Sequence, residues 1–370
     1  MAKCEEGVIE QKQAWRRRYW PWLGLLSFVG AGSMGFLVGG WLALRLTPPR
    51  PLVSEATADP LNVESPQAVV SPLIYNVRTA PPTTYDPDLQ AVVQQMVAWV
   101  QQRGLPTAHL SITLMDVSRP EAPQIAGYQQ QVLRYPASVV KLFWLVMFMA
   151  YQQAGLLSGE PVPPTELTAM MQLSSNDAAS RVVDAVTGTE SGDALSPEAF
   201  TQWKQRREQL NHFFRGAGYG YLNLKHKNFP IYAWGYEEPW GRELQLRGGN
   251  QQPSRNQLNT WQTARLLYEI YTLQAVSPLA SQRMLEWMTR SKPLPGFLGA
   301  GLPPDAQVMG KEGHTSTCRH DGVIVRRSDG RIAFVLVVFG DDPAYSADEQ
   351  FLPELARMAW LAMNQRSGRY

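Results

Sequence analysis

The hydrophobic pattern opens with an apolar run near the N-terminus, and its length predicts a membrane segment. Trp22 to Leu44 form 23 consecutive positions without a charge, enough to cross a bilayer as a helix. Three arginines (16–18) precede the run, and a basic flank of this kind stays in the cytoplasm. We therefore expect a cytoplasmic segment 1–21, a single transmembrane helix 22–44 in the inner (plasma) membrane, and a periplasmic or extracytoplasmic remainder.

A cleaved signal peptide and a buried core helix are the alternatives for this run. The run is longer than the apolar region of a usual signal peptide, and no clean A-x-A cleavage site follows it. A core helix would be out of place beside the next stretch, 45–84, which is rich in Pro, Ser, Thr and Ala without a sustained period. Such a composition is typical of an extended tether.

Regular periodicity begins at Tyr85 and predicts a folded domain over 85–366. Apolar residues at helical spacing follow Asp86, which is placed to cap a helix that Gly104 ends. β-rich stretches at 109–116 and 123–129 come next. Helical patterns occupy the middle of the chain, at 164–186, 197–215, 260–275 and 278–290. Two further strands, 322–327 and 331–340, flank a turn at 328–330, and a helix over 347–365 closes the pattern.

Strands at both ends with helices between them favour a sheet assembled from distant segments. Terminal helices would cover this sheet, with an all-helical lobe alongside. Composition agrees with a globular domain, at 44% apolar and 18% charged residues. The net charge of +2 gives no reason to expect nucleic acid as a partner, and two cysteines are too few for a disulfide framework.

The first chemical signal is a serine three residues before a lysine, Ser138 and Lys141, at the head of a strongly apolar helical run. At this spacing the two side chains share one face of a helix. Burial lowers the pKa of a lysine, and a neutral lysine accepts protons. The pattern therefore suggests a serine nucleophile with a lysine base, although S-x-x-K also arises by chance in long chains.

Two more short motifs follow in the same order along the chain. The triplet Ser174-Ser175-Asn176 precedes a helical pattern, and read alone it could equally be a helix cap. A predicted short strand, Gln307 to Lys311, ends in Lys-Glu-Gly, where Lys311 read alone could be an ordinary edge-strand charge.

Four residues that could bind metal come next, but their spacing fits no standard zinc site, so we expect neither metal nor cofactor: His314, Cys318, His320 and Asp321.

Taken together, S-x-x-K, S-x-N and K-x-G in this order resemble the motifs of the penicillin-recognising serine enzymes, and most of all those of class A β-lactamases. The resemblance covers about Tyr85 to Met363. It implies a β-lactamase/transpeptidase-like α/β (α+β) fold, in which helices flank an antiparallel five-stranded sheet and an all-helical subdomain lies alongside.

The resemblance also assigns roles to individual residues. Ser138 would be the acylated nucleophile, Lys141 its base, and Ser174 the proton shuttle to the leaving nitrogen. Substrate would be bound by Asn176, Lys311, Gly313 and His314. The main-chain N–H groups of Ser138 and His314 would form the oxyanion hole.

Three departures from the class A pattern, and an imperfect match in one loop, affect these roles. One departure is spacing, because the gap from Lys141 to Ser174 is short for the family and the stretch before the next landmark is long. Ser175 stands where an Asp is usual, and Glu312 replaces the usual hydroxyl residue beside Lys311, where it could repel an anionic substrate. The class A loop E-x-x-x-N supplies the deacylating base. Its best match starts at Glu238-Pro239 but has Arg242 in place of the Asn, with Glu237 and Glu243 nearby. We assign Glu238 as the base and expect slow deacylation, while solvated loop charges are the alternative reading.

The sequence therefore predicts a membrane-anchored serine hydrolase that forms an acyl-enzyme at Ser138, with β-lactam hydrolysis as its first candidate reaction. A D-Ala-D-Ala peptidase of the penicillin-binding type is the second candidate. A catalytically inactive wall-binding module is the third, favoured by Lys-Glu-Gly and the imperfect loop. The expected partners are a small-molecule β-lactam or a D-Ala-D-Ala-type peptide, and the membrane.

Overall fold

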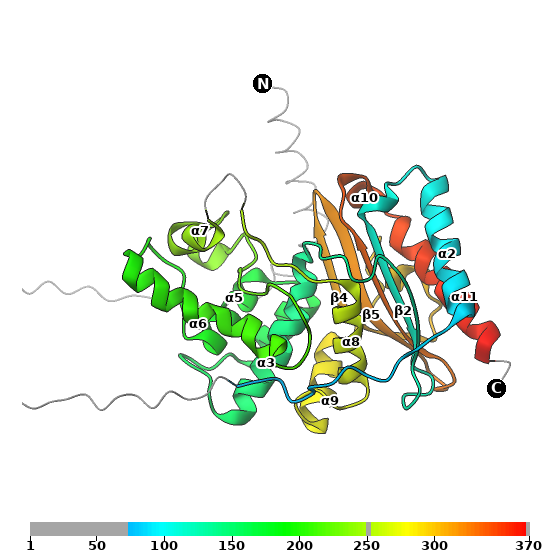
Figure 1. The fold of residues 1–370 in the computed structure, drawn as a ribbon, viewed down its shortest axis with the longest axis horizontal. Helices are drawn as coiled ribbons and strands as arrows, with labels where there is room; N and C mark the ends of the chain where they lie inside the picture. Colours follow the sequence, from blue (N-terminus) through cyan, green and yellow to red (C-terminus); the bar gives the residue numbers. More distant parts are fainter. Residues whose placement is uncertain (1–72, 249–252, 368–370) are drawn as a thin grey trace, which may run out of the picture. The chain divides into compact units, whose positions relative to one another are not determined.

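The centre of the fold is a six-stranded sheet with strand order β1-β3-β2-β6-β5-β4 (Figure 1). The structure is a computed structural model and describes residues 73–248 and 253–367. The strands are β1 (Thr84–Tyr85), β2 (Leu110–Asp116), β3 (Gln124–Tyr128), β4 (Ala306–Thr315), β5 (Cys318–Arg327) and β6 (Ala333–Gly340). Strands from the two ends of the domain meet in the middle, where β2 pairs with β6.

The expectation of five antiparallel strands is wrong by one strand. Five strands pair antiparallel, but the two-residue β1 runs parallel to β3, with Thr84 opposite Gln124 and Tyr85 opposite Ile125. The sheet is therefore mixed. The sequence did not reveal β1 because it is too short to show a period and falls at the end of the Pro-rich stretch.

Two terminal helices cover one face of the sheet, α2 (Pro87–Gln102) and α11 (Phe351–Ser367) (Figure 1). The side chain of Asp86 accepts a hydrogen bond from the N–H of Leu89 at 2.8 Å and caps α2 as expected. The apolar stripe of α2, including Val93 and Met96, is fully buried against the sheet and α11. The terminal helix predicted over 347–365 corresponds to α11, which begins four residues later, and a short helix that was not predicted, α10 (Pro343–Ala347), precedes it.

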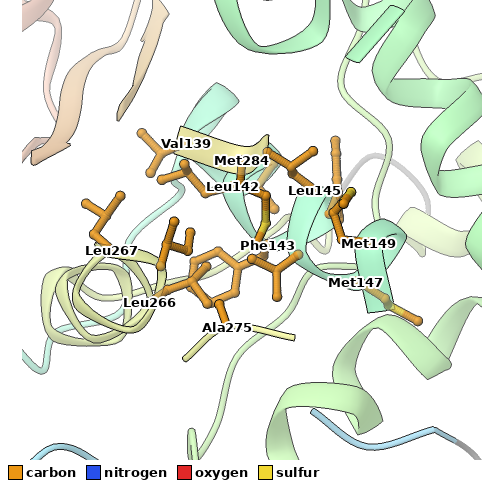
Figure 2. Packing of buried hydrophobic residues seen from close by; sticks show 14 of the residues in the cluster. Val139, Leu142, Phe143, Leu145, Met147, Met149, Leu266, Leu267, Ala275 and Met284 are labelled. Carbon is orange, nitrogen blue, oxygen red and sulfur yellow. The ribbon is translucent and has the colours of Figure 1, made fainter. Parts of the chain in front are cut away.

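The other face packs against α8 (Thr260–Tyr271), which contacts β2, β5 and β6. The helical lobe lies on this side and consists of α3 (Lys141–Ala154), α4 (Pro164–Gln172), α5 (Asn176–Thr187), α6 (Pro197–Arg215), α7 (Gly241–Arg247) and α9 (Pro278–Met288). The apolar run after Lys141 forms α3, which is buried on nearly all sides. Figure 2 shows Leu142 and Phe143 of α3 packed against α8 residues and Met284 of α9. Such an all-round apolar helix requires burial in a core.

The predicted helical stretch 164–186 is interrupted at the Ser-Ser-Asn triplet, and this interruption shapes the site. Helix α4 ends at Gln172 and α5 begins at Asn176. Ser174 takes φ 55°, in the left-handed region, and the side chain of Ser175 caps α5 by accepting from the N–H of Ala178 at 3.2 Å. The Ser at 175, where class A enzymes have Asp, therefore retains the capping function that either residue type can perform.

The folded chain begins before the boundary expected at Tyr85. Residues 73–78, which we call the N-terminal strap, pack across α6 and α8. Tyr75 is fully buried, its N–H donates to Phe213 O at 3.1 Å, and its ring lies 5.4 Å from that of Phe214. The expected transmembrane segment 22–44 lies outside the described residues, and no helix within the described ranges is long and apolar enough to span a bilayer.

Candidate active site

Ser138 lies in a short 3-10 helix, η2 (Ala137–Val140), that leads directly into α3. Its neighbours Ala137 and Val139 are buried, whereas Ser138 is partly exposed. Ala137 has φ 45°, a left-handed conformation that is uncommon for a residue with a Cβ. Strain of this kind is held in place by the surrounding packing and concentrates at functional sites. The tight turn thus presents one hydroxyl at the head of an otherwise buried helix.

Lys141 is fully buried, and its Nζ contacts four oxygen atoms, from Ser138, Ser174 and Asn176. Nζ donates to the main-chain oxygen of Ser174 at 2.7 Å and to Oδ1 of Asn176 at 2.8 Å, and it lies 3.1 Å from Oγ of Ser138. No carboxylate in the described ranges pairs with it. Burial, and next the positive charge of Lys311, lower the pKa of Lys141 well below its ordinary value of 10.5. A neutral amine can donate to two of these oxygens and direct its lone pair at the Ser138 hydroxyl.

The break between α4 and α5 brings the second motif to this lysine. The Oγ of Ser174 lies 3.3 Å from Nζ of Lys141. Asn176 accepts from Lys141 through Oδ1 and donates through Nδ2 to the main-chain oxygen of Pro230 at 3.1 Å. Four residues predicted from two separate motifs therefore form one hydrogen-bonded group, which we call the serine–lysine cluster: Ser138, Lys141, Ser174 and Asn176.

Strand β4 passes close behind the serine–lysine cluster at Gly313. A Cβ at Gly313 would lie 2.7 Å from Pro136 O and 3.1 Å from the main-chain nitrogen of Ser138, so this approach requires glycine. The predicted strand 307–311 is too short, because β4 continues in unbroken register with β5 from Ala306 to Thr315. Lys311 therefore lies within the strand and not at its end.

The main-chain N–H of His314 points to the open edge of β4, on the side of Ser138. The carbonyl of Val308 is on that edge, because it accepts from Arg290 N at 2.9 Å, away from β5. Main-chain groups alternate sides along an antiparallel strand, so His314, six residues further on, has the same orientation. The His314 side chain is exposed and contacts Ser346 Oγ at 3.0 Å. The geometry is thus compatible with two N–H groups, of Ser138 and His314, that face one oxyanion.

Lys311 does not stand alone at the site. It is fully buried and forms an ion pair with its neighbour Glu312. Arg290 lies 3.6 Å from Oε2 of Glu312 and pairs through two hydrogen bonds, at 2.9 and 2.6 Å, with Asp321. The four charges form an alternating network, in which the place of Arg290 could not be predicted from any motif.

The candidate base Glu238 is not brought to the serine–lysine cluster. Its side chain is exposed, as is that of Glu237, and within residues 73–248 and 253–367 neither forms a hydrogen bond or ion pair with the cluster. Glu243 is buried, where it pairs with Arg207 at 2.9 Å. Arg242 donates to main-chain oxygens of Glu190 and Asp193 and not to Glu238.

A different part of this loop faces the cluster. Asn228 donates through Nδ2 to Ala137 O at 3.3 Å, and Pro230 O accepts from Asn176. Phe229 lies between these two attachments. Nothing in the sequence singles out this stretch, because both contacts bridge segments far apart in the chain, 91 residues in the case of Asn228.

The residues that could bind a metal are engaged in other contacts. His320 is buried with Nε2 2.9 Å from Tyr135 O, and Asp321 pairs with Arg290. Within the described ranges, no group of three or more His, Cys, Asp or Glu side chains is arranged to hold a metal ion. A cavity of about 580 Å³ bordered by Asp116 and Arg119 shares no residue with the serine–lysine cluster. The site is therefore assigned from its hydrogen bonds and not from concavity.

Comparison with known proteins agrees with the fold. Residues 165–363, more than half of the chain, match the model of a family described as the beta-lactamase enzyme family. The match begins after Ser138 and Lys141, so these two residues are assigned from geometry and motif. No curated protein sequence matches the chain.

Solved structures similar to this chain include PBP-A, at 18% identity and a TM-score of 0.54 over 78% of this chain and 100% of PBP-A. A second is an ancestral class A β-lactamase (GNCA), with 18% identity, a TM-score of 0.52, and coverage of 73% and 99%. A third is a β-lactamase from Sphaerobacter thermophilus, with 14% identity, a TM-score of 0.53, and coverage of 76% and 98%. At these identities the similarity shows the fold alone.

Proposed function

Because the chain belongs to the beta-lactamase enzyme family, we propose that it is a serine acyl-transfer enzyme whose acyl-enzyme at Ser138 is hydrolysed slowly. This places it with the penicillin-binding type, acting on a peptide amide or a β-lactam, rather than with fast β-lactamases. The observation that carries the proposal is the position of Lys141, which is buried 3.1 Å from the Ser138 hydroxyl and has no counter-ion among the described residues.

Acylation uses the atoms of the serine–lysine cluster in sequence. Oγ of Ser138 attacks the substrate carbonyl while its proton moves to Nζ of Lys141, whose pKa burial lowers well below its ordinary value. The oxyanion accepts from the N–H groups of Ser138 and His314. Ser174 Oγ, 3.3 Å from Nζ, then passes a proton to the leaving nitrogen as the amide C–N bond breaks. The products are an ester at Ser138 and a neutral amine.

Hydrolysis of that ester needs a base for water, and this step has little support in the site. Within the described ranges no carboxylate contacts the serine–lysine cluster. Glu312 is the one carboxylate whose charge acts on the pKa of Lys141. Burial would raise the pKa of Glu312, but Lys311 and Arg290 hold it below its ordinary value, which makes Glu312 a poor base. A long-lived acyl-enzyme is the expected result.

The test is to incubate the purified full chain with a fluorescent penicillin and, separately, with an uncharged thioester, and to follow the Ser138 adduct by mass spectrometry. The proposal requires an adduct with at least one reagent, lost slowly, and none in Ser138→Ala. Rapid turnover of a chromogenic cephalosporin would instead identify a β-lactamase. Absence of an adduct with every reagent would favour the non-catalytic wall-binding module.

We propose in addition that residues 22–44 anchor the protein in the plasma membrane with the enzymatic domain outside, on the strength of the uncharged run and its arginine flank. Protease added to spheroplasts should then degrade the domain and spare the N-terminus. A domain that remains protected until the cells are lysed would contradict this orientation.

A further inference from the structure

The charge network beside the serine–lysine cluster contains as many anions as cations. Lys311 pairs with Glu312, and Arg290 lies between Glu312 and Asp321. Each cation therefore already has an anionic partner from the protein. A lysine in this condition is not a free binding site for a carboxylate of the substrate, because an incoming anion would have to displace or approach Glu312.

The network also presents its negative end outward. The Glu312 side chain is 13% exposed, compared with 7% for Arg290 and 0% for both Lys311 and Asp321. Glu312 is charged, since Lys311 and Arg290 overcome the effect of burial and lower the pKa of its carboxyl group. The most accessible charge of the network is thus a carboxylate.

Glu312 lies close enough to the reacting centre to act on the substrate. It directly precedes Gly313, whose position is fixed against the main-chain nitrogen of Ser138. The charges of Lys311 and Glu312 both act on Lys141, with opposite effects on its pKa. A substrate group that extends along β4 toward Lys311, while its carbonyl is over Ser138, would therefore come near the charge of Glu312.

We propose that Glu312 selects acyl donors whose leaving group carries a hydrogen-bond donor, such as a carboxamide or an ammonium group, and rejects those with a free carboxylate. A carboxamide NH₂ can donate to lone pairs of the Glu312 carboxylate that the network leaves unused. A substrate carboxylate at the same place meets a like charge in a largely desolvated setting, where repulsion is strong. This inference rests on the proposed function, since it concerns the acylation of Ser138.

The test uses two thioesters with the same acyl group, one with thioglycolate and one with thioglycolamide as leaving group. In each reaction the Ser138 Oγ–acyl bond forms, the C–S bond breaks, and the serine proton leaves with the thiol by way of Lys141. Second-order rate constants for adduct formation on the full chain are normalised to the rates with hydroxide. We expect the carboxamide to be preferred by about tenfold or more in the parent chain.

Variants connect this preference with Glu312. Glu312→Gln and Glu312→Thr remove the anion and should abolish or reverse the preference. The matched control is Glu286→Gln, which removes one exposed negative charge from α9, outside the network. It should leave the ratio as in the parent.

The outcomes separate this inference from the proposed function. If the parent acylates equally fast or faster with the thioglycolate, Glu312 does not select against carboxylates, although the acyl-enzyme proposal survives. The same holds if both Glu312 variants, with parent-like circular dichroism, keep the parent ratio. If no thioester acylates Ser138 in any chain, the proposed function itself is wrong and this inference is wrong with it.

Discussion

At the scale of single residues, the site depends on one lysine, Lys141, that is buried away from water and from carboxylates of the described residues. Lys141 combines complete burial with hydrogen-bond acceptors only, and among the described residues it has no carboxylate partner. Burial lowers the pKa of Lys311 as well, but its pair with Glu312 offsets part of that effect, and Lys141 lacks a pair of this kind among the described residues. The distinction between the two lysines therefore lies in their partners and not in their burial, which is complete for both.

The first prediction concerns the pH dependence of acylation. The neutral form of Lys141 is the base, and its pKa lies well below 10.5, so the acylation rate should rise with pH through that lowered pKa and then level off. Lys141→Ala should slow acylation by about two to four orders of magnitude and remove this rise. Mass spectrometry of samples quenched at successive times, between about pH 5 and 10, would measure the acylation rates of the parent and of Lys141→Ala. A variant that keeps the parent pH profile would show that another group is the base.

At the scale of elements, sequence patterns predicted the helices whose ends and buried faces depend on neighbouring residues in the chain. The Asp86 cap, the apolar stripe of α2 and the buried helix after Lys141 all follow from residues within a few positions of one another. The interruption at Ser174 was missed because a left-handed serine between two helical patterns has no composition signal. The loop that faces the cluster was missed for a related reason. Contacts made 91 and 54 residues away place Asn228 and Pro230 there, while Glu238 matched only a short motif.

The second prediction is that a carboxylate introduced at position 229 can act as the base for hydrolysis of the acyl-enzyme. Phe229 lies between Asn228, whose side chain donates to Ala137 O, and Pro230, whose carbonyl accepts from Asn176, so we expect the carboxylate of Phe229→Glu to lie close to the Ser138 ester. We expect hydrolysis of the acyl-enzyme to accelerate by about a hundredfold, the lower range for a positioned base. Glu238→Gln should leave the adduct lifetime unchanged, because Glu238 is exposed and has no contact with the cluster.

The lifetime of the Ser138 adduct formed with an uncharged thioester, followed by mass spectrometry, decides this prediction. Phe229→Gln is the matched control, since it has the size of the acid without its basicity. If Glu238→Gln prolongs the adduct, the assignment of Glu238 as base that the sequence suggested would be correct after all.

At the scale of the whole molecule, the N-terminal strap joins helices that lie far apart in the sequence. Tyr75 inserts between Phe213, Phe214 and Tyr219, with ring centroids 5.4 to 6.0 Å away. The strap also receives a hydrogen bond from Arg265 through Val77 O at 3.1 Å. Residues that the composition assigned to a tether therefore pack against the folded domain through buried aromatic contacts.

The third prediction is that this strap is required for stability. Tyr75→Ala removes a fully buried aromatic ring and should lower the free energy of unfolding by about 3–5 kcal/mol, as for other large-to-small core changes. A chain that starts at residue 73 should match the parent in urea unfolding, whereas one that starts at residue 79 should be as destabilised as Tyr75→Ala or more. Equal urea midpoints for the parent and for the chains that start at residues 73 and 79 would mean that the strap is dispensable.

The strap also imposes an order of events on a growing polypeptide. Asn76 hydrogen-bonds to Gln274 and Val276, 198 and 200 residues later in the chain. At synthesis rates of about 5–20 residues per second, the strap waits roughly 10 to 40 seconds before its partners exist. Strand β2 waits longer still, because its neighbour β6 spans Ala333–Gly340. The two N–H groups proposed to bind the oxyanion likewise include that of His314 in β4, so the newborn chain remains without a working site until residues 306–315 have been made.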